Sequence, residues 1–533
     1  MVEFDPTLVH KWLSRSARRF PDKEALLCGK DRWTYRALEQ HANLLAGALM
    51  KIGVKRGDRV VVLMDNSAET VISMYGILKA GGVFVILNGS LKGAKLDYIL
   101  NNSGAGVLIT HTSKAGVVNA VLGDGHRGVK VLWVGPKQRI PKELSGRSSS
   151  WDRVFSGLTA QPGVKDKNGS RLPRCIDVDL ACLIYTSGST GEPKGVMSTH
   201  HNMISAARSI IQYIGNVEDD IILDVLPLSF DYGLYQVIMA VMFGGTVVLE
   251  QSFVYIHQVL ERIRMERVTG FPIVPTIVAM LLNMDDIKKY DFSSVRYMTN
   301  TGAALPAEHI LRLRTMFPHV KIFSMFGLTE CKRVGYLPPE QLDTKPASVG
   351  KAMPNCETFV VDEKGSEVAP GQTGELIIRG SNVMQGYWQD PELTDKAYRP
   401  GRYPQDRILH SGDYFRQDED GFLYFLGRRD DMIKSKGERI SPKEIEDSIC
   451  RMGGVAEVAV IGLPDKILGQ AIKAFIVPAP GADLIEKDVL KYCSQNMEAF
   501  MVPKYIEFMD SFPKTPNGKI DKKKLKAREI AQT

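Results

Sequence analysis

The segment from Tyr185 to Gly195 has the residue types of a binding site for a polyphosphate. It reads Tyr-Thr-Ser-Gly-Ser-Thr-Gly-Glu-Pro-Lys-Gly, with four hydroxyl side chains besides the tyrosine, three glycines and one lysine. Glycines let backbone N–H groups surround an anion, while hydroxyls and a lysine add donors and positive charge. Because Lys194 precedes Gly195 and no Gly-Lys-Ser/Thr sequence follows, this is not a Walker A loop. We predict a polyphosphate cradle of another kind rather than a flexible turn.

The elements that must position this segment are strands and helices in alternation. Apolar runs typical of strands are separated by amphipathic stretches typical of helices, and this alternation indicates a parallel βαβ sheet. In chain order these are Val60–Met64, Ala68–Lys79, Val83–Leu87, Ala181–Tyr185, Asn202–Ile214 and Ile221–Leu226.

The pattern changes in the last third of the chain. Between about 340 and 427, short β-rich pieces alternate with turn signals, which indicates a small barrel or meander. The pieces are Glu357–Val361, Glu375–Arg379 and Phe422–Phe425. Beyond 430 the sequence predicts strands at Glu457–Ile461 and Ala471–Val477 and a helix at Glu486–Met497.

Composition excludes several classes of protein. The chain has 533 residues with a net charge of +7, and its basic tail from 514 to 533 has seven Lys or Arg against two Asp or Glu. No nucleic-acid motif accompanies that tail, so we interpret it as a solvated terminus. The seven scattered cysteines show no metal or disulfide spacing and favour a cytoplasmic location. No signal peptide and no apolar run of spanning length is present.

Further segments, in order, resemble motifs of the AMP-forming adenylating superfamily, which includes acyl-CoA synthetases, peptide-synthetase adenylation domains and beetle luciferases. The Tyr185–Gly195 string resembles its signature. The others are Trp33–Tyr35, Leu78–Gly82, Phe326–Glu330, Gly374–Gly380, Ser411–Asp413, Gly427–Ile440 and Pro513–Lys519. The matches run from about residue 33 to 520, which is nearly the whole chain.

The resemblance implies a fold class and a domain division. The fold would be α/β, with a large N-terminal domain of two doubly wound βαβ sheets plus a small β-barrel, and a smaller, mobile α+β C-terminal domain. Residues 1–428 would form the AMP-binding domain and residues 429–533 the mobile domain that carries a catalytic lysine. Asp430 would be the hinge between them.

The resemblance also implies roles for residues that match the motifs. Lys519, Thr329 and Lys434 would be catalytic, and Glu330 would hold Mg²⁺, a hard cation suited to oxygen ligands. Lys519 would act between the substrate carboxylate and the α-phosphate, whereas Lys434 would serve thioester formation together with Lys436 and Gly437. The remaining ATP-binding positions would be Thr186, Ser187, Gly188, Ser189, Thr190, Gly191, Lys194, Gly302, Ala303, Ala304, Phe326, Gly327, Asp413 and Arg428.

The chemistry explains why such groups are needed. A carboxylic acid with a pKa near 4 is ionised at pH 7, so its attack on a phosphate needs charge neutralisation rather than a general base. A thiol is nucleophilic enough to take the acyl group from the adenylate in a second step. The resemblance therefore implies an ATP-dependent ligase of fatty acid metabolism that makes acyl-AMP and pyrophosphate and then transfers the acyl group to CoA, with ATP, Mg²⁺ and coenzyme A as cofactor and cosubstrates.

The acid and the thiol are less determined. Phe230 stands where many fatty-acyl and aryl members have histidine, and Asp231 follows it, where a carboxylate can hold an ammonium or pair within the fold. We favour a carboxylic acid without an amino group, in a pocket with Phe230, Tyr232 and Thr301 as walls. The alternative to CoA is an acyl carrier protein. We expect no nucleic-acid or membrane partner, and the oligomeric state is open, with a homodimer as one possibility.

Other functions fit less well. A luciferase-like oxygenase shares the motifs, and a binding protein without catalysis would lack Lys519 or Glu330, which are both present. Each residue alone also has a structural explanation: Asp413 as a turn residue, Glu330 at a helix start, and Arg428, Asp430 and Lys434 as a solvated charge run. Their joint order and spacing overturn these explanations.

Overall fold

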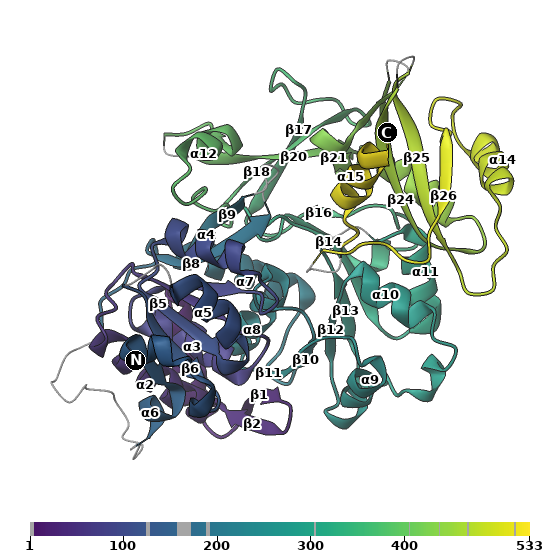
Figure 1. Cartoon of the computed structure of the whole chain (residues 1–533). Helices are drawn as coiled ribbons and strands as arrows, with labels where there is room; N and C mark the ends of the chain where they lie inside the picture. Colours follow the sequence, from purple (N-terminus) through teal and green to yellow (C-terminus); the bar gives the residue numbers. More distant parts are fainter. Residues whose placement is uncertain are drawn as a thin grey trace.

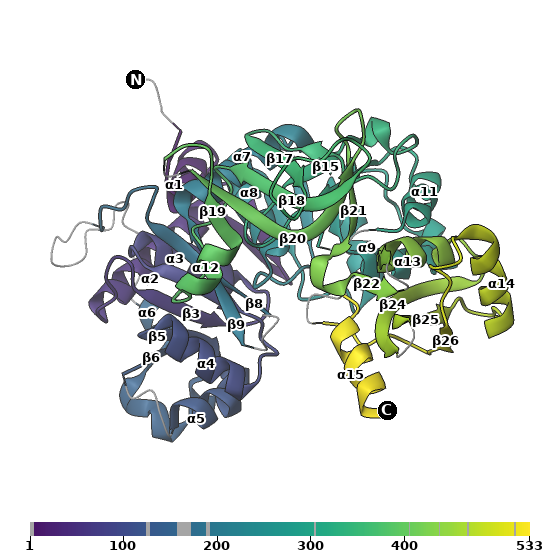
Figure 2. The same cartoon turned by 90° about the horizontal axis from the view of Figure 1, so that it is seen from above.

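The computed structural model describes residues 5–123, 128–156, 172–187, 192–302, 305–404, 406–435, 438–465, 468–515 and 519–532. A large N-terminal domain contains two mainly parallel sheets and a smaller antiparallel sheet, and a smaller C-terminal domain lies against it (Figures 1 and 2). This is the predicted α/β fold class. None of the described helices is long and apolar enough to cross a bilayer.

The first large sheet has nine strands in the order β16-β15-β14-β13-β12-β10-β11-β1-β2. Its central strands are parallel, and β2, β15 and β16 add antiparallel edges. The strands are β1 Glu24–Cys28, β2 Asp31–Thr34, β10 Ile221–Asp224, β11 Thr246–Leu249, β12 Gly270–Ile273, β13 Tyr297–Asn300, β14 Lys321–Phe326, β15 Gly335–Leu337 and β16 Lys351–Ala352.

The second large sheet has seven strands in the order β7-β6-β5-β3-β4-β8-β9, and only the last pair is antiparallel. That pair brackets the predicted phosphate-binding segment, and Thr186 pairs with Lys194 across it. The strands are β3 Arg59–Leu63, β4 Val83–Leu87, β5 Val107–His111, β6 Lys130–Val134, β7 Ser148–Ser150, β8 Leu180–Ser187 and β9 Pro193–Thr199.

Helices lie between the two sheets and on their outer faces. The inner helices share one hydrophobic core with strands of both sheets. They are α1 Val9–Arg19, α2 Tyr35–Lys51, α3 Ala68–Lys79, α7 His200–Ile214 and α8 Asp231–Phe243. The outer helices are α4 Gly93–Ser103 and α5 Ala115–Gly123 on the second sheet, and α9 Ile256–Met265, α10 Pro275–Leu282 and α11 Ala307–Met316 on the first.

Local sequence explains where these helices begin and end. The Thr199 hydroxyl accepts from the Asn202 backbone N–H, and the Asn202 side chain accepts from Thr199, so a capping box starts α7. Helix α8 ends at Gly244, whose φ of 84° favours glycine. Because α8 is apolar on all sides, it fits only in a buried layer. Its first turn therefore faces the interior.

The predicted barrel or meander is a five-stranded antiparallel sheet. It carries Asp413 and Arg428, two of the predicted ATP-binding residues. Its strands are β17 Cys356–Val361, β18 Thr373–Gly380, β19 Tyr398–Pro400, β20 Arg407–Gln417 and β21 Leu423–Arg428, and α12 Pro391–Ala397 lies beside it.

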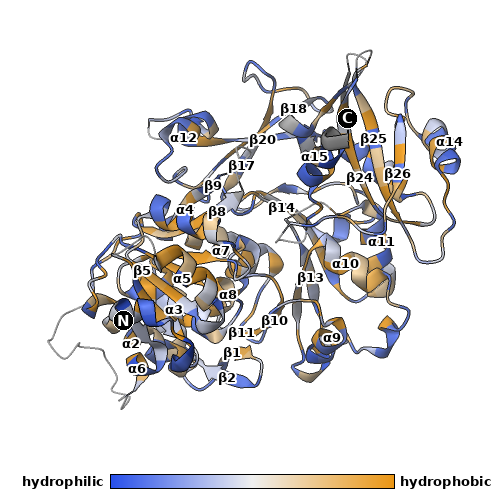
Figure 3. Cartoon of the chain, in the orientation of Figure 1, coloured by the Kyte–Doolittle hydropathy of each residue, from blue (hydrophilic) through white to orange (hydrophobic). Residues whose placement is uncertain are grey.

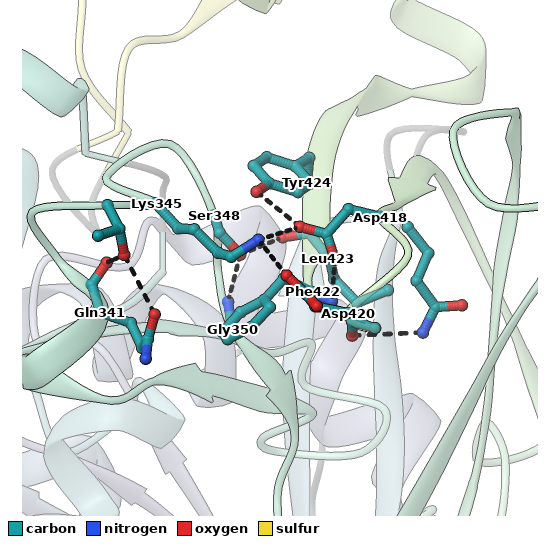
Figure 4. A network of polar contacts seen from close by, with 12 residues as sticks. Gln341, Lys345, Ser348, Gly350, Asp418, Asp420, Phe422, Leu423 and Tyr424 are labelled. Carbon is teal, nitrogen blue, oxygen red and sulfur yellow. Dashed lines mark hydrogen bonds and ion pairs between the residues drawn. The ribbon is translucent and has the colours of Figure 1, made fainter.

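Polar contacts attach the turn between β20 and β21 to the first large sheet (Figure 4). Lys345 forms ion pairs with Asp418 at 2.6 Å and Asp420 at 3.0 Å. The Leu423 backbone N–H donates to Gly350, where a Cβ would lie 1.6 Å from the Tyr336 carbonyl oxygen. Glycine is therefore required at 350, and the hairpin that carries Asp413 and Arg428 is fixed in place.

The C-terminal domain is a five-stranded sheet with helices on it. Its elements are β22 Ile433–Ser435, β23 Glu438–Ile440, α13 Pro442–Cys450, β24 Val455–Asp465, β25 Gly469–Pro478, α14 Glu486–Asn496, β26 Tyr505–Phe508 and α15 Lys522–Gln532. Helix α14 is largely hydrophilic in Figure 3, whereas α5 of the N-terminal domain is largely hydrophobic. The predicted strands and helix of this region are confirmed within a few residues.

Candidate active site

A cavity of about 340 Å³ lies where the two domains meet. From the N-terminal domain it receives the carboxyl ends of neighbouring parallel strands, at Thr301 after β13 and Phe326 in β14. From the C-terminal domain it receives residues of α13 and β24 and, near the chain end, Lys519. The carboxyl ends of parallel strands are where α/β sheets bind ligands.

Lys519 lies beside Gly302 and Phe230. A Cβ at position 302 would lie 3.2 Å from Cζ of Phe230 and 3.9 Å from Cε of Lys519, and φ is +86° there. Glycine thus keeps open the space between the lysine and the strand end. Partial removal from water lowers the pKa of Lys519, and the positive charge of Arg428 lowers it further. The carboxylates of Asp231, Asp413 and Glu330 act in the opposite direction but do not cancel the lowering.

Asp413 and Arg428 face each other on paired strands β20 and β21. Nε of Arg428 lies 2.9 Å from Oδ1 of Asp413, which is 1% exposed. Among the described residues, neither carboxylate oxygen accepts a hydrogen bond. Desolvation outweighs Arg428 and raises the pKa of Asp413 to about 7. Two buried acceptors without donors on a cavity wall fit a pair of ribose hydroxyls.

Phe326 gives the cavity a flat apolar wall. Its ring stacks on Phe425 with centroids 5.8 Å apart and contacts the edge of Phe415 at 4.9 Å. Phe326, Gly327 and Phe425 all line the cavity. A supported aromatic surface of this kind suits a purine base.

Glu330 is held by a residue that the sequence did not indicate. The hydroxyl of Tyr387 donates to Oε1 of Glu330 at 2.8 Å, and Nζ of Lys194 lies 5.7 Å from the centre of the Tyr387 ring. Val196 of β9 forms a bridge with Tyr387. Tyr387 thus links the hairpin to Glu330. The aromatic pair Tyr387-Trp388 after Gly386 was the available signal, but nothing in the sequence connects it to Glu330.

The predicted residues differ in how the structure places them. Gly188, Ser189, Thr190, Gly191, Ala303, Ala304, Lys436 and Gly437 lie outside the described residues, and Ser187 and Asp430 are described by their backbone only. Thr329 is half-buried next to the cavity residue Leu328. Lys434 is exposed on β22 and is not among the cavity-lining residues, so in this arrangement of the domains the cavity contains Lys519 without Lys434.

The predicted acyl-pocket residues are split between two layers. Phe230 and Thr301 line the cavity, whereas Tyr232 lies behind, with its hydroxyl 2.6 Å from the carbonyl oxygen of Thr299. Asp231 forms an ion pair with Lys332 at 3.3 Å. Of the two roles left open for Asp231, the structure shows pairing within the fold.

Known proteins share this architecture over the whole chain. The model of the AMP-binding enzyme family matches residues 13–388, and that of the AMP-binding enzyme C-terminal domain matches residues 444–519. A long-chain-fatty-acid–CoA ligase of Escherichia coli O157:H7 is 31% identical, covering 96% of this chain and 93% of its own. One of Bacillus subtilis (strain 168) is 32% identical, covering 97% and 94%. The crystal structure of the anthranilate CoA ligase AuaEII in complex with anthranoyl-AMP has a TM-score of 0.89 at 28% identity, covering 99% of each chain.

The fold and the cavity define an enzyme that activates an acid with a nucleotide. The chain belongs to the AMP-binding enzyme family, among the AMP-forming acyl-CoA synthetases. It is an ATP-dependent acid–thiol ligase that forms an acyl-adenylate, releases pyrophosphate and transfers the acyl group to CoA. The matching long-chain-fatty-acid–CoA ligases fit the expectation of fatty acid metabolism, and the carrier-protein alternative is not favoured.

Proposed function

We propose that the observed arrangement is the one that makes the adenylate. The observation that carries this proposal is the meeting of Lys519 with the unsatisfied carboxylate of Asp413 in one cavity, with Lys434 exposed outside it. ATP would lie with its base on Phe326 and its ribose hydroxyls donating to Asp413. Its phosphates would extend toward the β8–β9 hairpin, where Lys194 stands.

The first step needs positioning more than proton transfer. A carboxylate oxygen of the acid attacks the α-phosphorus, and the bond from that phosphorus to the bridging oxygen of pyrophosphate breaks. Both partners are anions, so Lys519 and Thr329 would neutralise and orient them. Desolvation, together with the charge of Arg428, lowers the pKa of Lys519. Negative charge from ATP and the acid would favour its protonated form.

Glu330 fits a Mg²⁺ ion that is shared with the phosphates. The described residues contain no cluster of three or more His, Cys, Asp or Glu that could hold a metal, so the protein would supply few ligands. That suits Mg²⁺, which is usually held by one or two carboxylates together with phosphates and water. The ion would neutralise charge on the phosphates, and Tyr387 would keep the Glu330 carboxylate in position.

The second step calls for a different face of the C-terminal domain. The CoA thiol loses its proton and attacks the acyl carbon, and the bond to the AMP oxygen breaks. We infer that residues 429–533 swing about Asp430 relative to residues 1–428, which removes Lys519 and brings in Lys434, Lys436 and Gly437. The exposed position of Lys434 on β22 supports this exchange.

All seven cysteines are free thiols, which supports a reducing, cytoplasmic setting.

The test separates the two steps. Pyrophosphate exchange into ATP is measured with short, medium, long, aromatic and amino acids, and thioester formation is measured after CoA is added. We expect one class of acid to drive exchange and CoA to yield its thioester. Absence of exchange with every acid, in folded protein that binds ATP, would remove the proposed role of Lys519.

A further inference from the structure

A group of buried charges lies directly behind the acyl end of the cavity. It contains Lys332, Arg333 and Asp231, which are 2%, 3% and 6% exposed. Lys332 pairs with Asp231 at 3.3 Å, and its Nζ lies 3.8 Å from the centre of the Tyr235 ring. Within the described chain no carboxylate forms an ion pair with Arg333, and its Nε has no hydrogen-bond acceptor. Two cations therefore share one anion.

The shortage of negative charge is not relieved by the other buried acid nearby. Desolvation raises the pKa of Asp224 well above its usual value, which disfavours the ionised form of this carboxyl group. Desolvation and the charge of Arg333 also lower the pKa of Lys332 to about 7, despite Asp231. An arginine cannot relieve the imbalance in this way, because its pKa stays above about 12. A buried guanidinium without a counter-ion is costly unless an anion arrives from outside.

Two walls of the cavity lead to this arginine. On one side, the ring of Phe230 lies 6.4 Å from that of Tyr232, and Cζ of Arg333 lies 5.4 Å from the Tyr232 ring. On the other, the Tyr213 hydroxyl contacts Sδ of Met325 at 2.9 Å and interacts with Arg333. Phe230 and Met325 line the cavity themselves.

The backbone of Arg333 also lies close to a residue that lines the cavity. A Cβ on Gly327, which lines the cavity, would lie 2.9 Å from Cα of Arg333 and 2.3 Å from the carbonyl oxygen of Lys332. Gly327 thus contacts the main chain of Arg333 directly, whereas the guanidinium of Arg333 lies against the Tyr232 ring and is linked to Met325 through Tyr213. A methionine can change its rotamers more readily than a branched or aromatic residue.

We propose that Arg333, assisted by Lys332, binds a second anionic group at the far end of the substrate, so that the acid is a short dicarboxylic acid rather than a long alkyl acid. This rests on the proposed function, in which the reacting carboxylate lies at Lys519. The second carboxylate supplies the counter-ion that the described residues lack, and a guanidinium suits it because it binds carboxylates through two parallel N–H donors. An extended alkyl chain would instead have to lie against desolvated charges.

Matched acids test the proposal directly. Pyrophosphate exchange is measured with butyrate against succinate and with hexanoate against adipate, together with palmitate and 4-aminobutyrate. We expect each diacid to exceed its monoacid by about 10- to 100-fold in kcat/KM, mainly through KM, as for a hydrogen bond to a charged group. Higher activity with palmitate, with the monoacids or with 4-aminobutyrate would overturn the proposal while leaving adenylation intact. No exchange with any of them would overturn the proposed function as well.

Variants distinguish recognition from structure. Arg333→Met should lower kcat/KM for the diacids far more than for the monoacids, and Arg333→Lys should restore part of the diacid advantage. The matched control is Arg379→Met, which removes an arginine that pairs with Glu357 and Asp406 and does not line the cavity, so it should keep the diacid preference. Equal loss with monoacids and diacids in Arg333→Met would contradict the assignment.

A measurement on the wild-type protein tests the proposal even if Arg333→Met does not fold. The wild-type protein with ATP is heated with adipate or with hexanoate at equal concentration, and adipate should raise the unfolding temperature more, because a ligand stabilises the state that binds it. An equal or larger rise with hexanoate would overturn the proposal.

Discussion

The two ends of the cavity differ in which polar groups lack partners. At the nucleotide end, Asp413 has two oxygens without donors. Behind the acyl end, Asp231 pairs with Lys332, and no carboxylate of the described residues pairs with Arg333. Lys519 lies between the two ends. The nucleotide end thus requires donors, as ribose hydroxyls provide, whereas the acyl end requires an anion. In this proposal one cavity binds two anionic substrates at separate places, with acceptors for the ribose hydroxyls and donors for the acid.

Lys519→Ala should have the largest effect on this arrangement. Loss of a charge-stabilising donor is expected to slow adenylation by about 10²–10³-fold. Thioester formation from an added acyl-adenylate should stay near the wild-type rate, because that step would use the other face of the domain. Lys524→Ala is the control, since this lysine is exposed on α15. Equal slowing of both steps would contradict the division of labour.

Asp231→Asn should destabilise the acyl end. It leaves Lys332 and Arg333 without an anion in a buried setting, which we expect to lower the free energy of unfolding by about 3 kcal/mol in a urea titration. Asp420→Asn removes an exposed partner of Lys345 (Figure 4) and should change stability little. An equal loss of unfolding free energy in the two variants would show that the buried ion pair contributes no more to stability than the exposed one.

Asp430→Pro should separate the half-reactions by restricting the hinge. Adenylation needs the arrangement already present and should persist. Thioester formation needs Lys434 to replace Lys519 and should fall by about 100-fold or more, as expected when reacting groups are misplaced. Exchange and thioester assays on the same preparation measure both rates. Equal losses would show that the hinge does not distinguish the two steps.

Asp413 predicts a pH dependence of ATP binding. Its pKa is raised to about 7, whereas ribose hydroxyls donate to the ionised form. Binding therefore releases a proton, and ATP affinity should rise by about tenfold from pH 6 to pH 8, since one pKa unit corresponds to a tenfold change. Asp413→Asn should bind more weakly and lose this dependence. Titration of ATP binding at several pH values measures this dependence. An affinity that falls as the pH rises would refute the assignment of Asp413 to the ribose hydroxyls.

Much of the fold could be predicted from the sequence. The boundaries of α3 and β4 agree with the predicted Ala68–Lys79 and Val83–Leu87, because capping residues, glycines and apolar runs act locally. The motifs also point to Lys519, Asp413 and Phe326, and the structure places all three on the wall of one cavity. Tyr387 was missed because its contact with Glu330 joins segments that are far apart in the chain.

The sequence alone predicts the chemistry of this protein: a glycine- and hydroxyl-rich segment expected to bind polyphosphate, a carboxylate expected to hold a metal and a lysine near the chain end expected to be catalytic. Which charges have partners is visible only in the folded chain. Lys332 and Arg333 are adjacent cations in the sequence, yet folding buries both, and Asp231 pairs with Lys332. Burial and pairing depend on which distant segments pack together, and a one-dimensional pattern does not contain that information.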